Sequence, residues 1–177
     1  MLIGITGKAG AGKDTVADYL VAQYEFTKLA WAGPLKAALA AMGFPEPASR
    51  DDKEKIIEGF PFSWRQLAQT LGTEWGRKND PDIWVKLMEH QLPKLVSNHG
   101  LPDLFVISDV RFENEAAMIR RNGYLIHITG RQAELGENAG HASEDGIIVQ
   151  GGDFLVNNNH DLESLYAQID NIAHDIK

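Results

Sequence analysis

A glycine-rich segment near the N-terminus constrains this chain more than any other feature. Residues 7–13 read Gly-Lys-Ala-Gly-Ala-Gly-Lys, directly after the apolar run Leu2–Thr6 and at the start of a segment with helical spacing. Glycines let the backbone curl so that successive N–H groups point inward, and a helix N-terminus adds positive potential. This spacing in a strand-to-helix context predicts a loop that binds phosphate groups, with the Lys13 ammonium beside the outer phosphates. The alternative interpretation is a merely tight turn between a strand and a helix.

One position departs from the usual pattern of such loops. Asp14 stands where a Ser or Thr hydroxyl usually ligates Mg²⁺, and Thr15 comes one residue later. Either Asp14 holds the metal through a water molecule, or the nucleotide and other carboxylates hold it while Thr15 binds an α-phosphate oxygen. The alternative explanation is that Asp14 has no metal role and is simply an acidic residue in the first turn of a helix, where the helix dipole favours a negative charge. Small-molecule kinases that read G-K-G-T lack the hydroxyl too, so the variant favours a kinase over a GTPase.

Length and composition exclude several classes of protein. The 177 residues suit one domain with its own core, and the absence of cysteine excludes a disulfide scaffold, a thiolate zinc site and a cysteine nucleophile. The net charge of −8 disfavours binding to a nucleic acid polymer or to an anionic membrane surface. Apolar runs stay well below the ~18 residues of a membrane span. Because the sequence opens directly on a strand pattern, we expect a cytoplasmic protein without a leader or membrane anchor.

Five short apolar runs predict strands. Most of them are continuously apolar, which is typical of parallel strands that are covered on both faces. Strands that alternate with helices predict a doubly wound α/β fold, whose ligands lie beyond the carboxyl ends of the strands. The predicted strands are Leu2–Thr6, Phe26–Ala30, Leu104–Ser108, Tyr124–Thr129 and Phe154–Val156.

Helical spacing fills the segments around these strands. It predicts helices over Lys13–Gln23 and over Phe112–Arg121, the second ended by Asn122-Gly123. Asp161 is a predicted N-cap of a last helix. The buried stripe expected on that helix comprises Leu162, Leu165, Ile169 and Ile172.

Residues 33–100 contain no convincing strand and predict a helical insertion. It includes a helix over Ser63–Trp75 and a longer one opened by Asp80-Pro81. Gly72 inside a helix costs about 1 kcal/mol relative to Ala, so we expect another group to approach its backbone closely. The apolar stripe expected on the 63–75 helix comprises Trp64, Leu67, Ala68, Leu71 and Trp75, and the opposite face comprises Arg65, Gln69 and Gly72. That face suits an anionic ligand with an amide-rich base, or is a solvated surface.

Charged residues follow the other predicted strands. Asp109 and Arg111 come after the third strand, where a carboxylate can orient Mg²⁺ waters and a guanidinium can clamp a phosphate. The alternative is a helix-start acid paired with a neighbouring arginine. Lys36 follows the second strand and Arg131 the fourth, each weak evidence alone. Residues 132–146, with three glycines among polar neighbours, predict an excursion between the fourth and fifth strands.

Taken in order, several short motifs resemble the phage-type deoxynucleoside monophosphate kinases, a family of P-loop enzymes, along nearly the whole chain. They are G-K-A-G-A-G-K-D-T at 7–15, A-G-P-L-K at 32–36, R-Q-L-A-Q-T-L-G-T at 65–73, W-V-K at 84–86, I-S-D-V-R-F-E-N-E at 107–115 and H-A-S-E at 141–144. The resemblance implies a P-loop NTPase fold with a five-stranded parallel sheet flanked by helices, a helical monophosphate-binding insertion at 33–100 and a short lid at 131–146. It implies transfer of the ATP γ-phosphoryl group to a deoxynucleoside 5′-monophosphate, with Mg²⁺.

The same resemblance implies roles for individual residues. Lys13, Asp109, Arg111 and Arg131 would be catalytic, with Asp14 and Asp109 facing Mg²⁺ through water. The ATP phosphates would bind Gly7, Ala9, Gly10, Ala11, Gly12, Lys13, Asp14 and Thr15, and the acceptor would bind Lys36, Arg65, Gln69, Gly72 and Arg111. The binding partner would be a small-molecule substrate. The protein would be cytoplasmic, in the host cell's cytoplasm if a phage encodes the chain, and whether it forms a homodimer is left open.

Two other functions remain open at this point. A kinase for another small acceptor, such as a dephospho-coenzyme A or a sugar acid, would share the loop and the strand order. A regulatory nucleotide-binding module would hydrolyse slowly and act through partners. The chain lacks an N-K-x-D base-reading motif and a D-x-x-G switch, which argues against the module.

Overall fold

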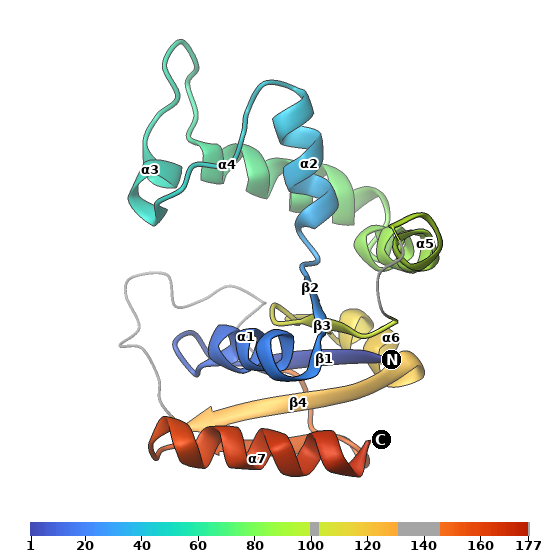
Figure 1. Ribbon diagram of the computed structural model, residues 1–177. Coiled ribbons are helices and arrows are strands. Elements are labelled where there is room, and N and C mark those ends of the chain that lie inside the picture. The colour runs from blue at the N-terminus through green and yellow to red at the C-terminus, as the bar shows by residue number, and fades with distance from the viewer. Residues whose placement is uncertain (100–102, 131–145, 177) are drawn as a thin grey trace. The chain divides into compact units, whose positions relative to one another are not determined.

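The computed structural model describes residues 1–99, 103–130 and 146–176. The chain divides into two compact units (Figure 1). The first, here called the sheet unit, comprises Met1–Ala30 and Lys94–Lys177, and the second, the helical unit, comprises Trp31–Pro93. The helical unit overlaps the predicted insertion from residue 33 to residue 93.

The sheet unit is built on five strands that all pair in parallel, in the order β2-β3-β1-β4-β5. This confirms the five predicted strands and the parallel α/β class. The strands are β1 Leu2–Gly7, β2 Thr27–Leu29, β3 Phe105–Ile107, β4 Gly123–Gly130 and β5 Phe154–Asn158.

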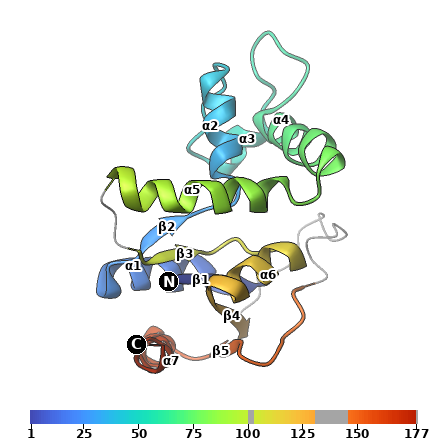
Figure 2. The same ribbon diagram turned by 90° about the vertical axis from the view of Figure 1, so that its right-hand side faces the viewer.

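Helices cover both faces of this sheet (Figure 2). Helices α1 (Lys13–Tyr24) and α7 (Leu162–Asp175) pack on one face, against a core that includes the fully buried Ile3 and Ile5. Helix α6 (Glu113–Asn122) packs on the other, so closely that a Cβ on Gly4 would lie 2.8 Å from the Ile119 side chain. Burial on both faces explains why the strands are continuously apolar.

The last helix confirms one sequence prediction and corrects another. Asp161 is the N-cap of α7, because its Oδ1 accepts a hydrogen bond of 2.8 Å from the Ser164 backbone N–H. Leu165, Ile169 and Ile172 are buried, but Leu162 is 50% exposed, so its place in the buried stripe was wrong. Side chains in a helix lean toward its N-terminus, and a residue of the first turn therefore projects past the surface on which the helix packs.

Gly123 joins α6 to β4 without an intervening loop. Helix α6 ends at Asn122, one residue past the predicted end, and the φ of Gly123 is 165°, which is ordinary extended backbone and not a left-handed cap. A Cβ there would overlap the Leu2 carbonyl oxygen, only 1.9 Å away. Gly123 is therefore required by the close approach of β1 and not by its own backbone angles.

The helical unit consists of helices around a separate apolar core. Leu35, Leu39, Trp64 and Trp84 form that core. Ser63 begins α4 with a capping box, since its Oγ accepts from the Gln66 N–H and its own N–H donates to Gln66 Oε1. The elements are α2 Gly33–Ala41, α3 Arg50–Glu54, α4 Trp64–Gln69, the π-helix η1 Thr70–Arg77 and α5 Ile83–His99, which runs on past the end of the unit.

The π-helix corrects a second sequence prediction. Trp75 was expected in the apolar stripe of a regular helix over 63–75, yet its side chain is 54% exposed. The stripe assumes 3.6 residues per turn, whereas the i→i+5 hydrogen bonds of a π-helix widen the turn and rotate later residues out of register. Trp75 lies after the change from α4 to η1, so it moves to the surface.

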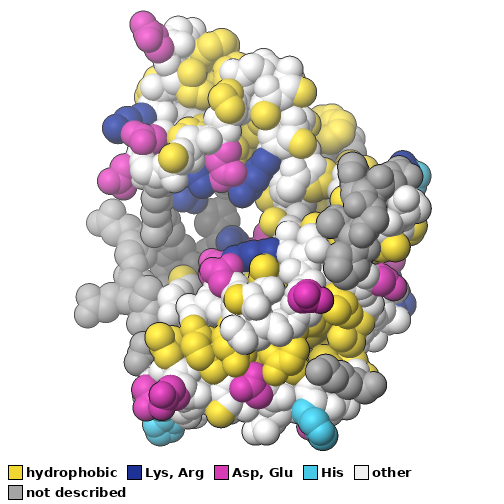
Figure 3. Space-filling model, viewed as in Figure 1, with side chains coloured by type: hydrophobic (Ala, Val, Ile, Leu, Met, Phe, Trp, Pro, Cys, Tyr) yellow, Lys and Arg dark blue, Asp and Glu magenta, His cyan; other side chains and the backbone are white. Residues whose placement is uncertain are grey.

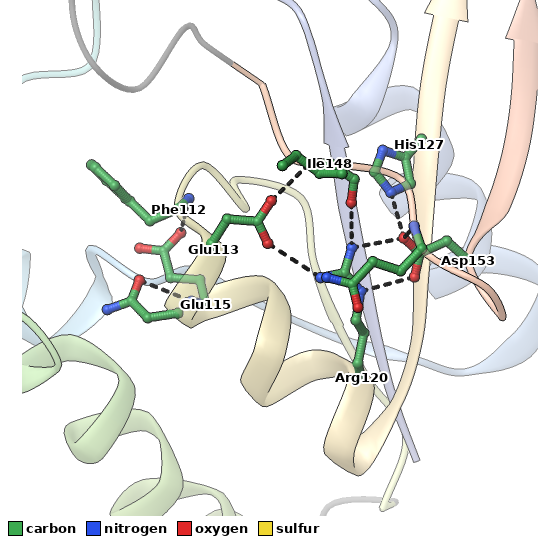
Figure 4. Close-up of polar contacts among 9 residues, drawn as sticks. Phe112, Glu113, Glu115, Arg120, His127, Ile148 and Asp153 are labelled. Carbon is green, nitrogen blue, oxygen red and sulfur yellow. Dashed lines mark hydrogen bonds and ion pairs between the residues drawn. The ribbon is translucent and has the colours of Figure 1, made fainter.

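A buried ionic network ties residues 148–153 to the rest of the sheet unit (Figure 4). Asp153 is 2% exposed, and its Oδ2 lies 2.7 Å from an Arg120 Nη and 2.9 Å from His127 Nε2. Arg120 also donates to the Ile148 carbonyl, and the Ile148 N–H donates to Glu113. The network therefore joins α6, β4 and residues 148–153.

The outer edge of β5 is paired by a side chain. The Gln168 amide of α7 accepts from the Asn157 N–H at 2.9 Å and donates to the Asn157 carbonyl at 3.0 Å. Gln168 thus makes the pair of hydrogen bonds that a further strand would make at this residue.

Candidate active site

The predicted phosphate loop lies between β1 and α1, at the carboxyl end of the first strand. Gly10 and Gly12 have φ values of 76° and 99°, in the left-handed region that residues with a Cβ rarely adopt. Ala11 between them is buried, and Thr15 is partly buried in the first turn of α1. The loop therefore keeps a fixed, curled backbone that depends on glycine.

The Lys13 ammonium points back to this loop. Its Nζ donates to the carbonyl oxygens of Gly7 at 2.7 Å and of Lys8 at 2.9 Å. Burial lowers the pKa of Lys13, and the nearby Arg111 guanidinium lowers it further. The charges of Asp14 and Asp109 oppose this only in part. The structure thus brings four of the predicted site residues into one electrostatic cluster.

Asn158, at the end of β5, holds the loop from the other side. Its Nδ2 donates to the Ala11 carbonyl at 2.9 Å and is buried. A Cβ on Gly12 would lie 2.6 Å from the same nitrogen. The tip of the loop is therefore attached to a strand that begins more than 140 residues later in the sequence.

Asp14 is held by a residue of a neighbouring strand end. Ser108, directly after β3, is buried, and its Oγ donates to Asp14 Oδ1 at 2.8 Å. Lys28 Nζ lies 3.0 Å from the same oxygen and 2.8 Å from Asp18. Burial raises the pKa of Asp14, but the hydrogen bonds from Ser108 and Lys28 outweigh it, so the net pKa is below the ordinary range.

Asp109 and Arg111 follow β3 as predicted, and the start of α6 fixes the backbone around Arg111. The Val110 N–H donates to the Ile5 carbonyl. The buried Glu115 carboxylate accepts from the backbone N–H groups of Arg111 at 2.9 Å and Phe112 at 3.2 Å. The exposed Arg111 side chain is thus carried on a backbone segment with defined partners.

The carboxylates beside the loop fit a magnesium ion that is shared with a nucleotide. Mg²⁺ prefers oxygen ligands and commonly uses one or two carboxylates together with substrate phosphates and water. Asp14 and Asp109 supply two carboxylates near Lys13. Among the described residues no group of three or more His, Cys, Asp and Glu side chains could hold a metal by itself. A metal at this position could be shared between these two carboxylates, water and the phosphates of a ligand.

The helical unit contains two of the cations predicted to bind the acceptor, Lys36 and Arg65. Lys36 Nζ lies 3.0 Å from one oxygen of Glu46, and Lys53 Nζ lies 2.5 Å from the other. Lys53 also lies over the Trp64 ring, 5.6 Å from its centroid. In Figure 3, basic and acidic side chains of this unit lie next to one another on the surface. The two lysines therefore share one carboxylate.

The predicted face of α4 and η1 is also charged. Arg65 pairs with Glu54, and Gln69 is exposed. The group that approaches the Gly72 backbone belongs to the same unit, because Trp84 Nε1 donates to the Gly72 carbonyl at 3.0 Å. A Cβ on Gly72 would also lie 3.0 Å from Leu35 Cδ1. Internal packing therefore explains this glycine without a ligand.

Arg131 and nearly all of the predicted lid at 131–146 lie outside the described residues.

Four residues that the sequence analysis did not single out take part in the contacts described above. They are Ser108, Asn158 and Glu115 in the sheet unit and Lys53 in the helical unit. The sequence did contain a signal for Asn158, because a run of three asparagines at 157–159 follows the fifth apolar run.

No helix of the described part is long and apolar enough to cross a membrane.

Comparisons with known proteins bear on this site. A family model described as deoxynucleotide monophosphate kinase matches residues 46–169. The deoxynucleotide monophosphate kinase of Enterobacteria phage T4 is 25% identical over 241 residues, which cover 96% of this chain and 97% of that protein. A protein of Acanthamoeba polyphaga mimivirus with the same name, given provisionally, is 30% identical over 187 residues, 96% of this chain and 94% of that one.

The fold has a counterpart among solved structures. TT1252 from Thermus thermophilus matches with a TM-score of 0.59 and 18% identity, over 100% of this chain and 98% of that one. The glycine loop between β1 and α1 and the all-parallel sheet make this a P-loop fold. The family model covers more than half of the chain, and the mimivirus relative is similar over nearly all of it. The chain therefore belongs to the deoxynucleotide monophosphate kinase family.

Proposed function

We propose that this protein transfers the γ-phosphoryl group of ATP to a deoxynucleoside 5′-monophosphate, giving the diphosphate and ADP, with Mg²⁺. The observation that supports this most strongly is the position of Lys13, which is bound to the carbonyls of the phosphate loop beside Asp109 and Arg111. Family membership supports the choice of acceptor. A small nucleotide substrate also agrees with the cytoplasmic location predicted from the sequence.

The sheet unit would bind the donor. The backbone N–H groups of the loop and the N-terminus of α1 provide positive potential for phosphates. The Lys13 ammonium would lie beside the oxygens between which the γ-phosphoryl group moves. To do so, it would exchange its hydrogen bond to a loop carbonyl for one to a phosphate oxygen. Such transfer depends mainly on positioning and charge neutralisation, and the hydrogen bonds from Lys13 to its loop carbonyls hold its charge in one place.

Magnesium would be held beside the loop by Asp14 and Asp109, in large part through water. When bound, Mg²⁺ neutralises charge on the phosphates. Asp14 would face the metal's water from a fixed position, since Ser108 and Lys28 both bind its carboxylate. Arg111 would contact the acceptor phosphate from the same strand end as Asp109.

The helical unit would bind the acceptor. Lys36 and Arg65 are cations whose present partners, Glu46 and Glu54, are carboxylates on the surface of the same unit. A phosphate carries more charge than a carboxylate and accepts a bidentate contact from arginine. Gln69 and Gly72 would complete this side. During the reaction an acceptor phosphate oxygen attacks the γ-phosphorus, the bond to the bridging oxygen breaks, and ADP leaves.

The test is a steady-state assay of ADP formation by the purified chain with Mg²⁺ and ATP. Each deoxynucleoside and ribonucleoside monophosphate is offered in turn, with dephospho-coenzyme A and a set of sugar acids as alternative acceptors. ATP without an acceptor measures hydrolysis. We expect ADP to form only when a deoxynucleoside monophosphate is present, with one diphosphate made for each ADP. Turnover with another acceptor only, or slow hydrolysis that no acceptor stimulates, would overturn the proposal.

A further inference from the structure

The contact between Ser108 and Asp14 reverses a familiar pair of residues. In many P-loop proteins a Ser or Thr hydroxyl of the loop and a carboxylate from a neighbouring strand together hold Mg²⁺. This chain has the carboxylate of Asp14 in the loop position and the hydroxyl of Ser108 at the end of β3, which pairs directly with β1. Both chemical groups are present: the Asp14 carboxylate stands in the usual place of the hydroxyl, and the Ser108 hydroxyl stands at the strand end, one residue before the Asp109 carboxylate.

The two side chains are in contact, and their geometry is asymmetric. Ser108 is 8% exposed and donates to Asp14 Oδ1 at 2.8 Å, and Lys28 Nζ lies 3.0 Å from that same oxygen. In the part of the chain that the structure describes, both contacts of Asp14 therefore use Oδ1. The Asp14 side chain is 78% exposed. The side chain is thus largely accessible to solvent, while its carboxylate is anchored through Oδ1.

We propose that Ser108 and Asp14 form the magnesium-facing pair of this loop with their places exchanged, and that Ser108 is the positioning residue. The Ser108 hydroxyl and the Lys28 ammonium would hold Oδ1, so that Oδ2 faces a water molecule on nucleotide-bound Mg²⁺. This inference rests on the proposed function, because it assumes that the loop binds a Mg²⁺–nucleotide complex.

A contact that only joins two elements of the fold would behave differently. Lys28 links β2 to α1 through Asp14 and Asp18, whereas the Ser108 hydrogen bond links the end of β3 to the same helix. A purely structural Ser108 predicts lower stability without any change in the response to metal. An exchanged pair predicts a change in the response to Mg²⁺ even in a variant whose fold is intact.

The first test measures ATP binding by calorimetry in the absence of an acceptor, once with Mg²⁺ and once with a chelator. We expect Ser108→Ala to reduce the gain in affinity that Mg²⁺ provides by about 10-fold, the usual effect of removing a group that orients a metal ligand. Affinity without metal should not change. Ser108→Thr keeps the hydroxyl and should keep the gain. Ser49→Ala is the matched control, because Ser49 makes a similar hydrogen bond to Asp52 in the helical unit.

The second test exchanges the two residues. Asp14→Ser removes the carboxylate, and Ser108→Asp places two carboxylates side by side, so each single variant should bind ATP–Mg²⁺ weakly. The double variant restores the more usual arrangement and should exceed both single variants by roughly 10-fold, which a double-mutant cycle measures as coupling. Thermal unfolding of every variant shows whether Ser108→Asp folds; if it does not, the Ala and Thr variants still decide the question.

The outcomes separate this inference from the proposed function. If the wild-type protein phosphorylates deoxynucleoside monophosphates and Ser108→Ala keeps its full Mg²⁺ response, the exchanged pair is refuted and the kinase activity stands. If Asp14→Ser and Ser108→Asp lose affinity independently, with no recovery in the double variant, the pair is likewise refuted. If Mg²⁺ does not strengthen ATP binding to the wild-type protein, both the inference and the magnesium part of the proposed function fail.

Discussion

The sheet unit and the helical unit hold their charged residues in opposite ways. In the sheet unit, Lys13 is bound by backbone carbonyls of its own loop and Asp153 is 2% exposed within an ionic network. In the helical unit, Lys36 and Arg65 are paired with carboxylates on side chains that remain 28% to 51% exposed. Exposed ion pairs contribute about 0–1 kcal/mol, whereas breaking a buried one costs about 3–5 kcal/mol.

This difference indicates that the two units hold their charged residues for different purposes. Groups that must stand in one place before the ligand arrives are fixed by the backbone and by buried partners. The cations that we propose to bind the acceptor phosphate, Lys36 and Arg65, are paired with carboxylates that they can release at little cost in free energy. Five predictions test this contrast, starting with the largest effect.

Lys13→Ala tests the fixed side of the comparison. We expect kcat to fall by at least about 10³-fold, because the variant loses a positioned charge that stabilises the moving phosphoryl group. Initial-rate assays at saturating substrates measure the effect, and circular dichroism shows that the fold is kept. Lys13→Arg is the conservative control. Near-normal turnover by a well-folded Lys13→Ala variant would contradict both the site and the comparison.

Asp153→Ala tests whether the buried network stabilises the sheet unit. Removing one partner of a buried pair leaves Arg120 without its main carboxylate, so we expect the free energy of unfolding to fall by about 3–5 kcal/mol in denaturant titrations. A loss below about 1 kcal/mol would mean that this network is no stronger than a surface pair.

The same network predicts how stability depends on pH. Burial raises the pKa of Asp153, but hydrogen bonds from Arg120, the Gln150 N–H and His127 outweigh it and hold the pKa far below its ordinary value. The folded pKa is thus lower than the unfolded one, near 3.9, so the contribution is complete at neutral pH and is lost as the pH falls below about 5. The stability difference between wild type and Asp153→Ala should therefore shrink in acid.

Arg65→Ala and Arg111→Ala test the proposed binding of the acceptor. Loss of a charge-assisted contact is worth about 1.5–3 kcal/mol, so each variant should raise the KM for the monophosphate by roughly 10-fold to 100-fold. The KM for ATP should change less. Weakening of ATP alone by either variant would place that residue on the donor side.

Glu54→Ala gives the smallest expected effect and is the counterpart of Asp153→Ala. It removes the partner of Arg65 on the surface, so the free energy of unfolding should change by less than about 1 kcal/mol. A loss as large as that of Asp153→Ala would remove the distinction between fixed and exchangeable charges.

The strands and the phosphate loop could be predicted because their signals are local. A continuous apolar run indicates a strand that is buried on both faces. The spacing from Gly7 to Lys13 indicates a curled loop backbone, independently of the residues that pack around it in the fold. The location of Asp109 and Arg111 near Lys13 could be predicted from position alone, since the ends of parallel strands meet at one edge of the sheet.

The remaining site residues depend on contacts that no local pattern encodes. Ser108 is an ordinary serine until β3 is paired beside β1, and Glu115 resembles a first-turn acid until its carboxylate is buried. Asn158 lies 147 positions from Ala11, whose carbonyl it binds. The helical stripe failed at Trp75 because a change of helix type alters the period on which the prediction was based.

The pairing of Gln168 with Asn157 also bears on how the molecule meets other copies of itself. An exposed sheet edge is a template for the strand of another chain, and natural proteins block such edges to avoid aggregation. At β5 the Gln168 amide already occupies both the N–H and the C=O of Asn157. At the opposite edge, β2 is only three residues long and has a lysine at its centre. Continuous pairing of sheets between molecules would therefore have to displace a glutamine at one edge or accept a short, charged strand at the other.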